Sequence, residues 1–296
     1  MGEENKTYEI VVSGVTKRFE KKEGSFLALD EVNLKIDKNE FICVVGPSGC
    51  GKTTLMNIIA GLYPPSTGTV KVRGEVVTGP GKGKGVVFQQ YALYPWLTVE
   101  KNVAFGLKMK GVGKEEREEI ARKYIHIVGL DKFAKSYPKE LSGGMKRRVG
   151  LVQALLHEPD FLIVDEPTTG LDPEERIRIR NLLVDFAEER TVLFSTHVVE
   201  DLMATCNQLA VMKKGRFLYT GTMRELLNKA RGHVWECCTE DESLARELER
   251  KYHISSKQYT EEGIRLRLLG ENMPSESGCI ACDVTLEDAY IYVTNR

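Results

Sequence analysis

The stretch GPSGCGKTT, residues 46–54, lies directly after the apolar segment EFICVV (40–45) and directly before LMNIIAGL (55–62), whose apolar residues recur at helical spacing. It fits the pattern G-x-x-x-x-G-K-[ST] in the strand, loop and helix setting that this pattern requires. Its glycines let successive backbone N–H groups approach phosphate oxygens closely. Lys52 is then placed to reach the outer phosphates, and the Thr53 hydroxyl to bind Mg²⁺. The predicted phosphate-binding residues are Gly46, Pro47, Ser48, Gly49, Cys50, Gly51, Lys52, Thr53 and Thr54.

A pair of carboxylates ends a second apolar run, FLIVDEP, at residues 161–167. Asp165, at the end of a predicted buried strand, is placed to hold Mg²⁺ through water. Glu166 lies one residue further toward the terminal phosphate, where a carboxylate can polarise the attacking water as a general base. The alternative is an acidic pair that only caps the following helix.

The segment ELSGGMKRR, residues 140–148, makes a known family recognisable. Together with the two motifs above, it resembles the ATP-binding cassette (ABC) ATPases, whose LSGGQ-like segment opens a helix. The resemblance implies that Ser142, Gly143 and Gly144 contact the γ-phosphate of an ATP held by a second subunit. Met145 replaces the usual Gln, outside the residues assigned to phosphate contact.

Four further positions match landmarks of this family. Gln89 in GVVFQQ is placed to bridge Mg²⁺ or the attacking water, and His197 in VLFSTH to hydrogen-bond the γ-phosphate and orient Glu166. The resemblance implies a contact of Asp172, in TTGLDP, across a dimer interface. Phe19 in VTKRFE stands where relatives stack an aromatic ring, more often Tyr, on adenine. A packing role is the alternative for Phe19, and a structural role the alternative for a histidine that follows a strand.

The resemblance and the hydrophobic pattern predict an α/β fold, a P-loop NTPase of the ABC type. We expect a mostly parallel sheet with an antiparallel flank from residues 7–19 and 26–36, which alternate with period two. Residues 1–231 are predicted to form the nucleotide-binding domain, with a helical subdomain at about 90–144 that includes helices at 99–110 and 114–130. Residues 232–296 are predicted to form a small C-terminal α+β domain, which closes with a helix capped by Thr285.

The chain has seven cysteines, an odd number spread over 296 residues, which argues against a disulfide scaffold and for a reducing cytoplasm. Four of them, Cys237, Cys238, Cys279 and Cys282, lie near the C-terminus. The C-x-x-C spacing of the last two is compatible with a zinc or redox site. Adjacent cysteines point to opposite faces of a strand, however, so we expect buried, apolar thiols.

The expected function is that of an ATP-hydrolysing subunit of a membrane transporter. Two copies, head to tail, would sandwich two ATP molecules, and we expect a homodimer, with a paralogous cassette as the alternative. With 42 basic and 43 acidic residues the net charge is −1, and we expect no nucleic acid partner. No apolar run approaches the roughly 20 residues of a membrane span. We therefore expect a separate permease, with the chain at the cytoplasmic face of the membrane.

The segment YALYPWLTV, residues 91–99, is the predicted docking surface for that permease, centred on Trp96. The alternative is that these aromatic residues only pack the helical subdomain.

The direction of transport is left open by two resemblances. Residues up to about Gly144 resemble ATPases of nitrate, sulfonate and taurine importers, which would add a substrate-binding protein as a partner. Residues from about Arg147 resemble the drug and antibiotic exporter ATPases. We expect importer-like coupling, with an exporter as the alternative. A soluble cassette ATPase of DNA repair or ribosomes is less compatible, because those relatives usually carry two cassettes or a long coiled coil.

Overall fold

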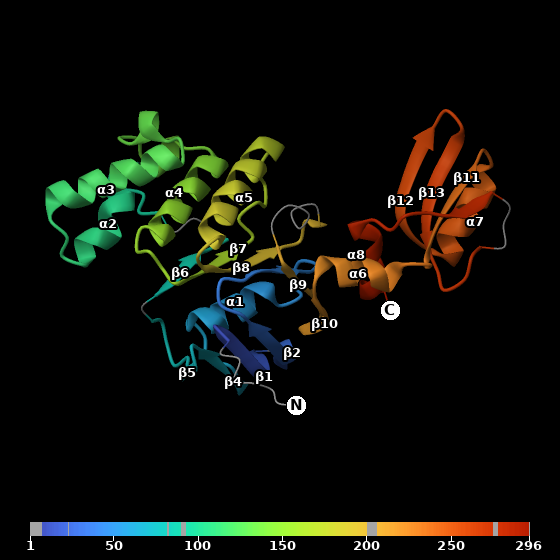
Figure 1. Ribbon diagram of the computed structural model, residues 1–296, viewed down its shortest axis with the longest axis horizontal. Coiled ribbons are helices and arrows are strands. Elements are labelled where there is room, and N and C mark those ends of the chain that lie inside the picture. Colours follow the sequence, from blue (N-terminus) through green and yellow to red (C-terminus); the bar gives the residue numbers. More distant parts are fainter. Residues whose placement is uncertain are drawn as a thin grey trace. The chain divides into compact units, whose positions relative to one another are not determined.

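The computed structural model describes residues 8–22, 24–81, 83–89, 93–199, 206–274 and 278–295 (Figure 1). The chain divides into two compact units. The first contains residues up to 207 together with 212–217, and the second contains residues 208–211 and those from 218 onward. The division therefore runs through β9 (Gln208–Lys213) and β10 (Arg216–Gly221). The domain boundary at residue 231 remains a prediction.

An antiparallel sheet in the first unit confirms the predicted flank. Its strand order is β2-β1-β4-β5, and β1 pairs antiparallel with both β2 and β4. Inward-facing residues such as Val12 and Leu34 are buried, as the period-two pattern predicts. The bounds are β1 (Ile10–Lys21), β2 (Gly24–Ile36), β4 (Thr67–Val72) and β5 (Glu75–Val76).

Four parallel strands form the centre of the first unit. They bring three predicted site segments together: the phosphate-binding loop, the carboxylate pair and His197. In the order β3, β8, β7 and β6, each strand pairs in parallel with the next. Every residue of β3, β7 and β8 is buried, as expected for strands covered on both faces. Since the carboxyl ends of parallel strands meet at one edge, the loops after β3, β7 and β8 lie close together. The bounds are β3 (Phe41–Val45), β6 (Lys84–Val87), β7 (Phe161–Asp165) and β8 (Thr191–Thr196).

Helix α1 (Lys52–Ala60) follows β3 after the loop of residues 46–51, and α5 (Pro173–Ala187) begins seven residues after Glu166. Three other helices, α2 (Val99–Met109), α3 (Lys114–Ile127) and α4 (Gly143–Leu155), share one apolar core that includes Leu107, Ile125 and Val152. They form the predicted helical region, with the short turns η1 (Asp131–Phe133) and η2 (Pro138–Glu140) between α3 and α4. The core extends into α4, beyond the predicted end at residue 144.

The second unit is the small α+β structure predicted for the C-terminal part. Its sheet has the order β12-β13-β11-β14, with antiparallel neighbours. Ala245 and Leu248 of α7 pack on one face of this sheet, and α6 contacts α8, whose N-cap is Thr285 as predicted. The bounds are α6 (Met223–Ala230), β11 (Val234–Thr239), α7 (Glu242–Lys251), β12 (His253–Thr260), β13 (Gly263–Leu269), β14 (Cys279–Ala281) and α8 (Leu286–Thr294).

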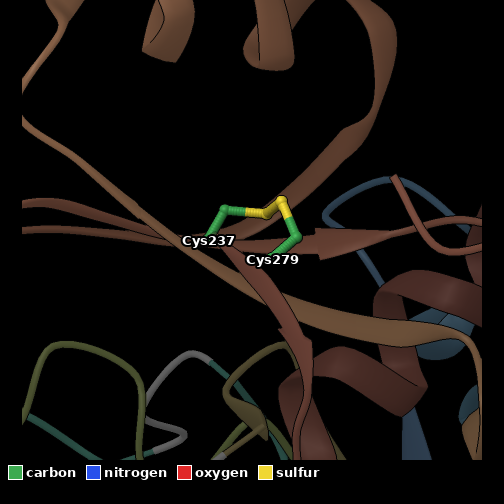
Figure 2. The surroundings of a disulfide bond; sticks show 2 residues. All are labelled: Cys237 and Cys279. Atoms are coloured by element: carbon green, nitrogen blue, oxygen red, sulfur yellow. A yellow bond between two sulfur atoms is a disulfide. The ribbon is translucent and has the colours of Figure 1, made fainter. Parts of the chain in front are cut away.

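A disulfide joins Cys237 of β11 to Cys279 of β14 (Figure 2). The two cysteines are direct partners in the antiparallel pairing of these strands, which brings their Cα atoms to 4.1 Å. The expectation of buried free thiols is therefore wrong for Cys237 and Cys279. It is also wrong for Cys238, which is exposed, and for Cys282, which is only partly buried. The opposite orientation of Cys237 and Cys238 agrees with strand geometry.

Candidate nucleotide site

The loop of residues 46–51 has a backbone that only glycine permits at two points. Gly51 has φ +113°, and a Cβ there would lie 2.7 Å from the carbonyl oxygen of Ala28. A Cβ on Gly46 would meet the carbonyl oxygen of Met212. The first N–H groups of α1, which begins at Lys52, have no acceptor within the helix, and the N-terminal end of a helix attracts anions. The local geometry therefore suits a bound phosphate group.

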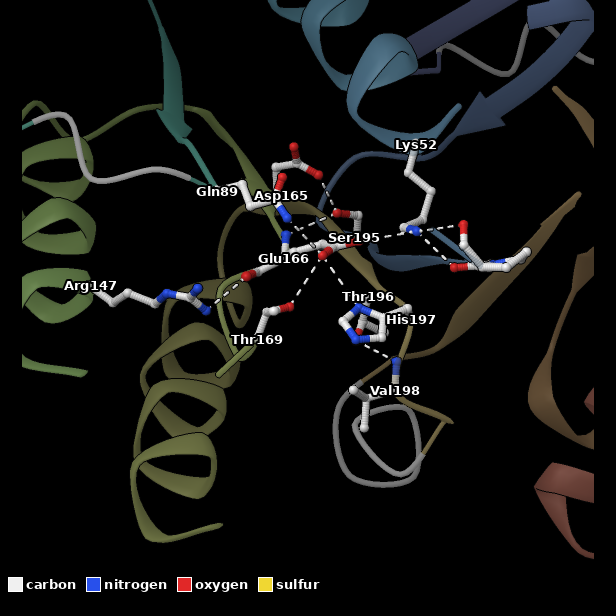
Figure 3. Close-up of polar contacts among 12 residues, drawn as sticks. Lys52, Gln89, Arg147, Asp165, Glu166, Thr169, Ser195, Thr196, His197 and Val198 are labelled. Atoms are coloured by element: carbon white, nitrogen blue, oxygen red, sulfur yellow. Dashed lines mark hydrogen bonds and ion pairs between the residues drawn. The ribbon is translucent and has the colours of Figure 1, made fainter. Parts of the chain in front are cut away.

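Lys52 is buried and connects this loop to the end of β7. Its Nζ donates hydrogen bonds to the carbonyl oxygens of Gly46 (2.7 Å) and Pro47 (3.3 Å). The same nitrogen lies 3.1 Å from Oε1 of Glu166 (Figure 3). The lysine and carboxylate of two separate sequence motifs thus form an ion pair.

The other carboxylate oxygen of Glu166 has three partners. Oε2 accepts hydrogen bonds from Gln89 Nε2 at 3.1 Å and from the Thr169 hydroxyl at 3.2 Å. It also lies 3.3 Å from Nδ1 of His197 (Figure 3). The structure therefore brings together all three residues predicted to be catalytic, Gln89, Glu166 and His197. Thr169 was missed, although it lies within the quoted TTGLDP segment.

The backbone of Glu166 is strained and held in place. Its φ of +46° lies in the left-handed region, which costs a non-glycine residue about 1–3 kcal/mol. Its N–H donates to the Ser195 hydroxyl (3.0 Å), and its carbonyl accepts a hydrogen bond from the buried guanidinium of Arg147 (2.8 Å). Sequence reasoning missed both residues. The available signal for Ser195 was a hydroxyl directly after the apolar run VLF, next to Thr196.

Three predicted Mg²⁺ ligands supply oxygen donors around this site. Asp165 is buried, and its Oδ1 accepts a hydrogen bond of 2.6 Å from the Ser195 hydroxyl. The Thr53 hydroxyl belongs to an exposed residue, and Gln89 contributes an amide oxygen. A hydroxyl, an amide and a carboxylate suit Mg²⁺, which commonly takes its remaining ligands from phosphate and water. Within the described ranges, no group of three or more His, Cys, Asp and Glu residues is arranged as a metal site.

Two of the residues implied to contact a second subunit, Ser142 and Asp172, are helix N-caps in this chain. The Ser142 hydroxyl accepts a hydrogen bond from Met145 N–H at the start of α4 (3.2 Å), and Asp172 Oδ1 accepts one from Glu175 N–H at the start of α5 (2.9 Å). The carboxylates of Asp165 and Glu166 are therefore not the caps of that helix. In the described part of the chain, no hydrogen bond or ion pair joins residues 142–144 to residues 46–54.

For two residues predicted to contact the nucleotide, Phe19 and Cys50, the structure shows only the surroundings of the side chain. Phe19 is half-buried, packs edge-on against Tyr63 with ring centroids 6.1 Å apart, and has Lys17 Nζ 5.1 Å from its ring centre. The Cys50 thiol faces inward, and burial raises its pKa. Cys50 is therefore placed to offer a bound phosphate its backbone rather than its side chain.

The fold and this arrangement define a P-loop nucleotide-binding domain. Residues 29–169 match the family described as ABC transporter. The uncharacterised ABC transporter ATP-binding protein MJ0412 of Methanocaldococcus jannaschii is 47% identical over 206 residues, which cover 69% of this chain and 77% of that protein. The nitrate import ATP-binding protein NrtD of Synechocystis sp. is 42% identical over 203 residues, 68% of this chain and 76% of NrtD.

The aliphatic sulfonates import ATP-binding protein SsuB of Bacillus cereus is 40% identical over 205 residues, which cover 69% of this chain and 80% of SsuB. Among solved structures, a dimeric post-hydrolysis state of the ATP-binding cassette MJ0796 with ADP and Pi superimposes with a TM-score of 0.68. That match has 31% identity and covers 72% of this chain and 98% of the cassette. The chain belongs to the ABC transporter family, as one of its ATP-binding proteins.

Proposed function

We propose that this protein hydrolyses ATP as a subunit of a membrane transporter with importer-like coupling. The observation that carries the proposal is the contact of Glu166 with Lys52, Gln89 and His197, which joins the phosphate-binding loop to a general base. The relatives named as nitrate and sulfonate import proteins support the importer assignment.

The ion pair between Lys52 and Glu166 suggests how ATP prepares the site. A bound phosphate competes with the Glu166 carboxylate for the Lys52 ammonium group, because both are anions. When Lys52 turns to the phosphate, Oε1 of Glu166 loses its partner and becomes the acceptor for a proton from water. Gln89, Thr169 and His197 keep the carboxylate in place through Oε2. Mg²⁺ on Thr53, Asp165 and Gln89 would neutralise the phosphate oxygens.

A second protomer would complete the site. Ser142, Gly143 and Gly144 have no hydrogen bond or ion pair to residues 46–54 of their own chain in the described ranges. We assign them to the nucleotide of a second copy, as in a head-to-tail homodimer, with Asp172 near the interface. The dimeric state of the similar cassette structures supports this arrangement.

The proposed permease contact lies on the loop before α2. Asn102 is fully buried, and its side chain accepts a hydrogen bond from Tyr94 N–H and donates to the carbonyl oxygens of Tyr94, Leu97 and Thr98. Tyr94 packs against Phe105, so the packing alternative holds for that residue. Trp96 lies against Tyr94, with ring centroids 5.7 Å apart, but is 70% exposed on this hydrogen-bonded loop. An ordered, exposed tryptophan is typical of a binding surface. Tyr91 and Ala92 of the predicted surface lie outside the described residues.

In the described part of the chain, no helix has both the length and the apolar character to cross a bilayer. The relatives named as import ATP-binding proteins support a location at the cytoplasmic face of the membrane, bound to permease subunits. An importer would add a substrate-binding protein, and no nucleic acid takes part. A permease gene and a binding-protein gene next to this one would support import, whereas a permease gene alone would favour export.

The substitution Glu166→Gln tests the proposed chemistry. It keeps the shape of the side chain but removes both the base and the competitor for Lys52, so ATP should bind at least as tightly as to wild type while turnover falls about 100-fold or more. ATP should then hold the variant as a dimer, measured by size-exclusion chromatography with light scattering. Glu174→Gln, which changes an exposed carboxylate on α5, is the matched control. Wild-type turnover in the Glu166 variant would refute the assignment of the base.

A further inference from the structure

The sheet of the second unit has one face that α7 does not cover. Cys237 and Leu266 belong to the apolar core under α7, so their neighbours along each strand point to the other face. Glu236 pairs with Arg267, and Arg267 pairs with Ser256, across three adjacent strands. Arg265 lies on the same face, two residues from Arg267. These side chains and the first turn of α8 line a cavity of about 300 Å³.

One wall of this cavity is a closed network. Asp288, in the first turn of α8, is almost fully buried. Its carboxylate accepts hydrogen bonds from Arg267 NH2 (2.6 Å), from Thr285 N–H (2.8 Å) and from the Ser255 hydroxyl. Burial acts to raise the pKa of Asp288, but these hydrogen bonds outweigh it and lower the pKa. This carboxylate is therefore charged, saturated and structural.

The rest of the charged lining is incompletely paired. Glu236 lies 3.7 Å from Arg265 Nε and 3.6 Å from Arg267 NH1, which is too long for hydrogen bonds. Arg265 Nε is a buried atom without a hydrogen-bond partner in the described part of the chain. Glu287 also lines the cavity, and its exposed carboxylate has no ion pair or hydrogen bond within the described ranges. Arg265 donates one long hydrogen bond, from NH2 to Glu262 (3.4 Å), and Arg267 uses its NH2 for Asp288 and the carbonyl oxygen of Asp283. Arg265 Nε, Arg267 NH1 and the carboxylates of Glu236 and Glu287 thus retain unused hydrogen-bonding capacity.

We propose that this cavity binds a small zwitterion of the size and charge of a free α-amino acid. Its carboxylate would bind the guanidinium groups of Arg265 and Arg267, and its ammonium group the carboxylates of Glu236 and Glu287. The volume is at the lower end of the roughly 300–1,000 Å³ range of ligand pockets, which suits a small ligand. Only a ligand with both charges satisfies both sets of groups without changing the net charge of the cavity.

This site is separate from the nucleotide site. All the residues that line it lie in the second unit, outside residues 29–169 that match the family. The proposal therefore stands whether or not Glu166 is the base of ATP hydrolysis.

Calorimetric titration of the full-length protein with each of the common amino acids, up to about 10 mM, tests the proposal. At least one should bind saturably, with one site per chain. Its N-acetyl derivative lacks the ammonium group, and its amide lacks the carboxylate. Each should bind about tenfold more weakly or worse. Absence of saturable binding, or equal binding of the N-acetyl derivative, which would identify a plain anion site, overturns the proposal.

Two variants locate the binding. Arg265→Gln and Glu236→Gln should each weaken it about tenfold or more. Arg246→Gln, which alters an exposed pair with Glu242 on α7, should not change it. Circular dichroism and the unfolding midpoint should stay close to wild type, because the two variants lose only ion pairs beyond hydrogen-bond distance and one hydrogen bond of 3.4 Å to the exposed Glu262. Unchanged affinity in folded Arg265→Gln and Glu236→Gln would contradict the assignment.

Discussion

Glu166 is the residue on which most contacts of the nucleotide site converge. Its carboxylate touches the phosphate-binding loop through Lys52, while its strained backbone is held by Ser195 and Arg147. Arg147 lies on α4, five residues after Ser142. If Ser142 contacts the nucleotide of a second protomer, a displacement of α4 would shift the backbone of Glu166 through the hydrogen bond from Arg147. We regard Arg147 as a positioning residue.

Replacing Arg147 with Met should lower kcat about 10- to 100-fold while the Kd for ATP changes little, because a shifted carboxylate no longer aligns with the attacking water. The lost hydrogen bond to a buried carbonyl should also lower the free energy of unfolding by about 1–3 kcal/mol. Steady-state kinetics, equilibrium nucleotide binding and chemical denaturation measure these three quantities.

Two further variants distinguish positioning from general destabilisation. Arg147→Lys keeps a donor and should recover part of kcat, and Lys123→Met removes an exposed charge on α3 and should have no effect. A loss of ATP affinity as large as the loss of kcat would count against a positioning role.

At the scale of elements, the disulfide fastens the short edge strand β14 to β11. Its cysteines are 42 residues apart, so the bond closes a long loop and reduces the entropy of the unfolded chain. Strand β14 leads directly to Thr285, the cap of α8, and to Asp288 in the wall of the cavity. The disulfide therefore stabilises the surroundings of the proposed zwitterion site.

Removing the disulfide with Cys279→Ser should destabilise the second unit by about 2–4 kcal/mol. Hydrogen exchange of the amides in β11 and β14 should accelerate, while exchange in β3 and β7 stays unchanged. Reductant should have the same effect on the wild type and none on the variant. Cys282→Ser, at a free cysteine three residues away, is the control. Equal exchange in oxidised and reduced wild type would show that the disulfide does not contribute.

At the scale of the whole molecule, each proposed reaction centre needs two chains. The turnover per chain should therefore rise with protein concentration until dimers predominate, and this can be followed by ATPase assays over a dilution series. Ser142→Ala should lower the turnover about tenfold or more at saturating ATP, because a donor to the γ-phosphate is lost.

Ser142 is also the N-cap of α4, so a cap control is needed. Thr98→Ala removes the equivalent cap of α2, at a cost of about 1 kcal/mol. Thr98 lies in the predicted docking surface but outside the predicted nucleotide site. The variant should leave turnover nearly unchanged. A rate per chain that is independent of concentration, together with full activity of Ser142→Ala, would exclude the two-chain site.

The gathering of Lys52, Glu166 and His197 was predictable because each follows a buried apolar run, and adjacent parallel strands end at the same edge of a sheet. Thr285 was predictable as a cap from the acidic residues that follow it. Arg147 and Ser195 were not predictable as partners of the Glu166 backbone, because such contacts depend on side-chain direction across separate elements. The resemblance predicted a role for Ser142 but not its local use as a cap.

By itself, the sequence determined the antiparallel flank, the helices at 99–110 and 114–130, the phosphate-binding loop and the carboxylates at the end of β7, because these depend on neighbouring residues and on hydrophobic periodicity. Only the tertiary structure decided that Cys237 pairs with Cys279, and that Glu236, Arg265 and Arg267 meet on one open face. The reason is register: the alignment of strands tens of residues apart is decided by packing and turn geometry, and a shift of one residue would turn every side chain to the other face.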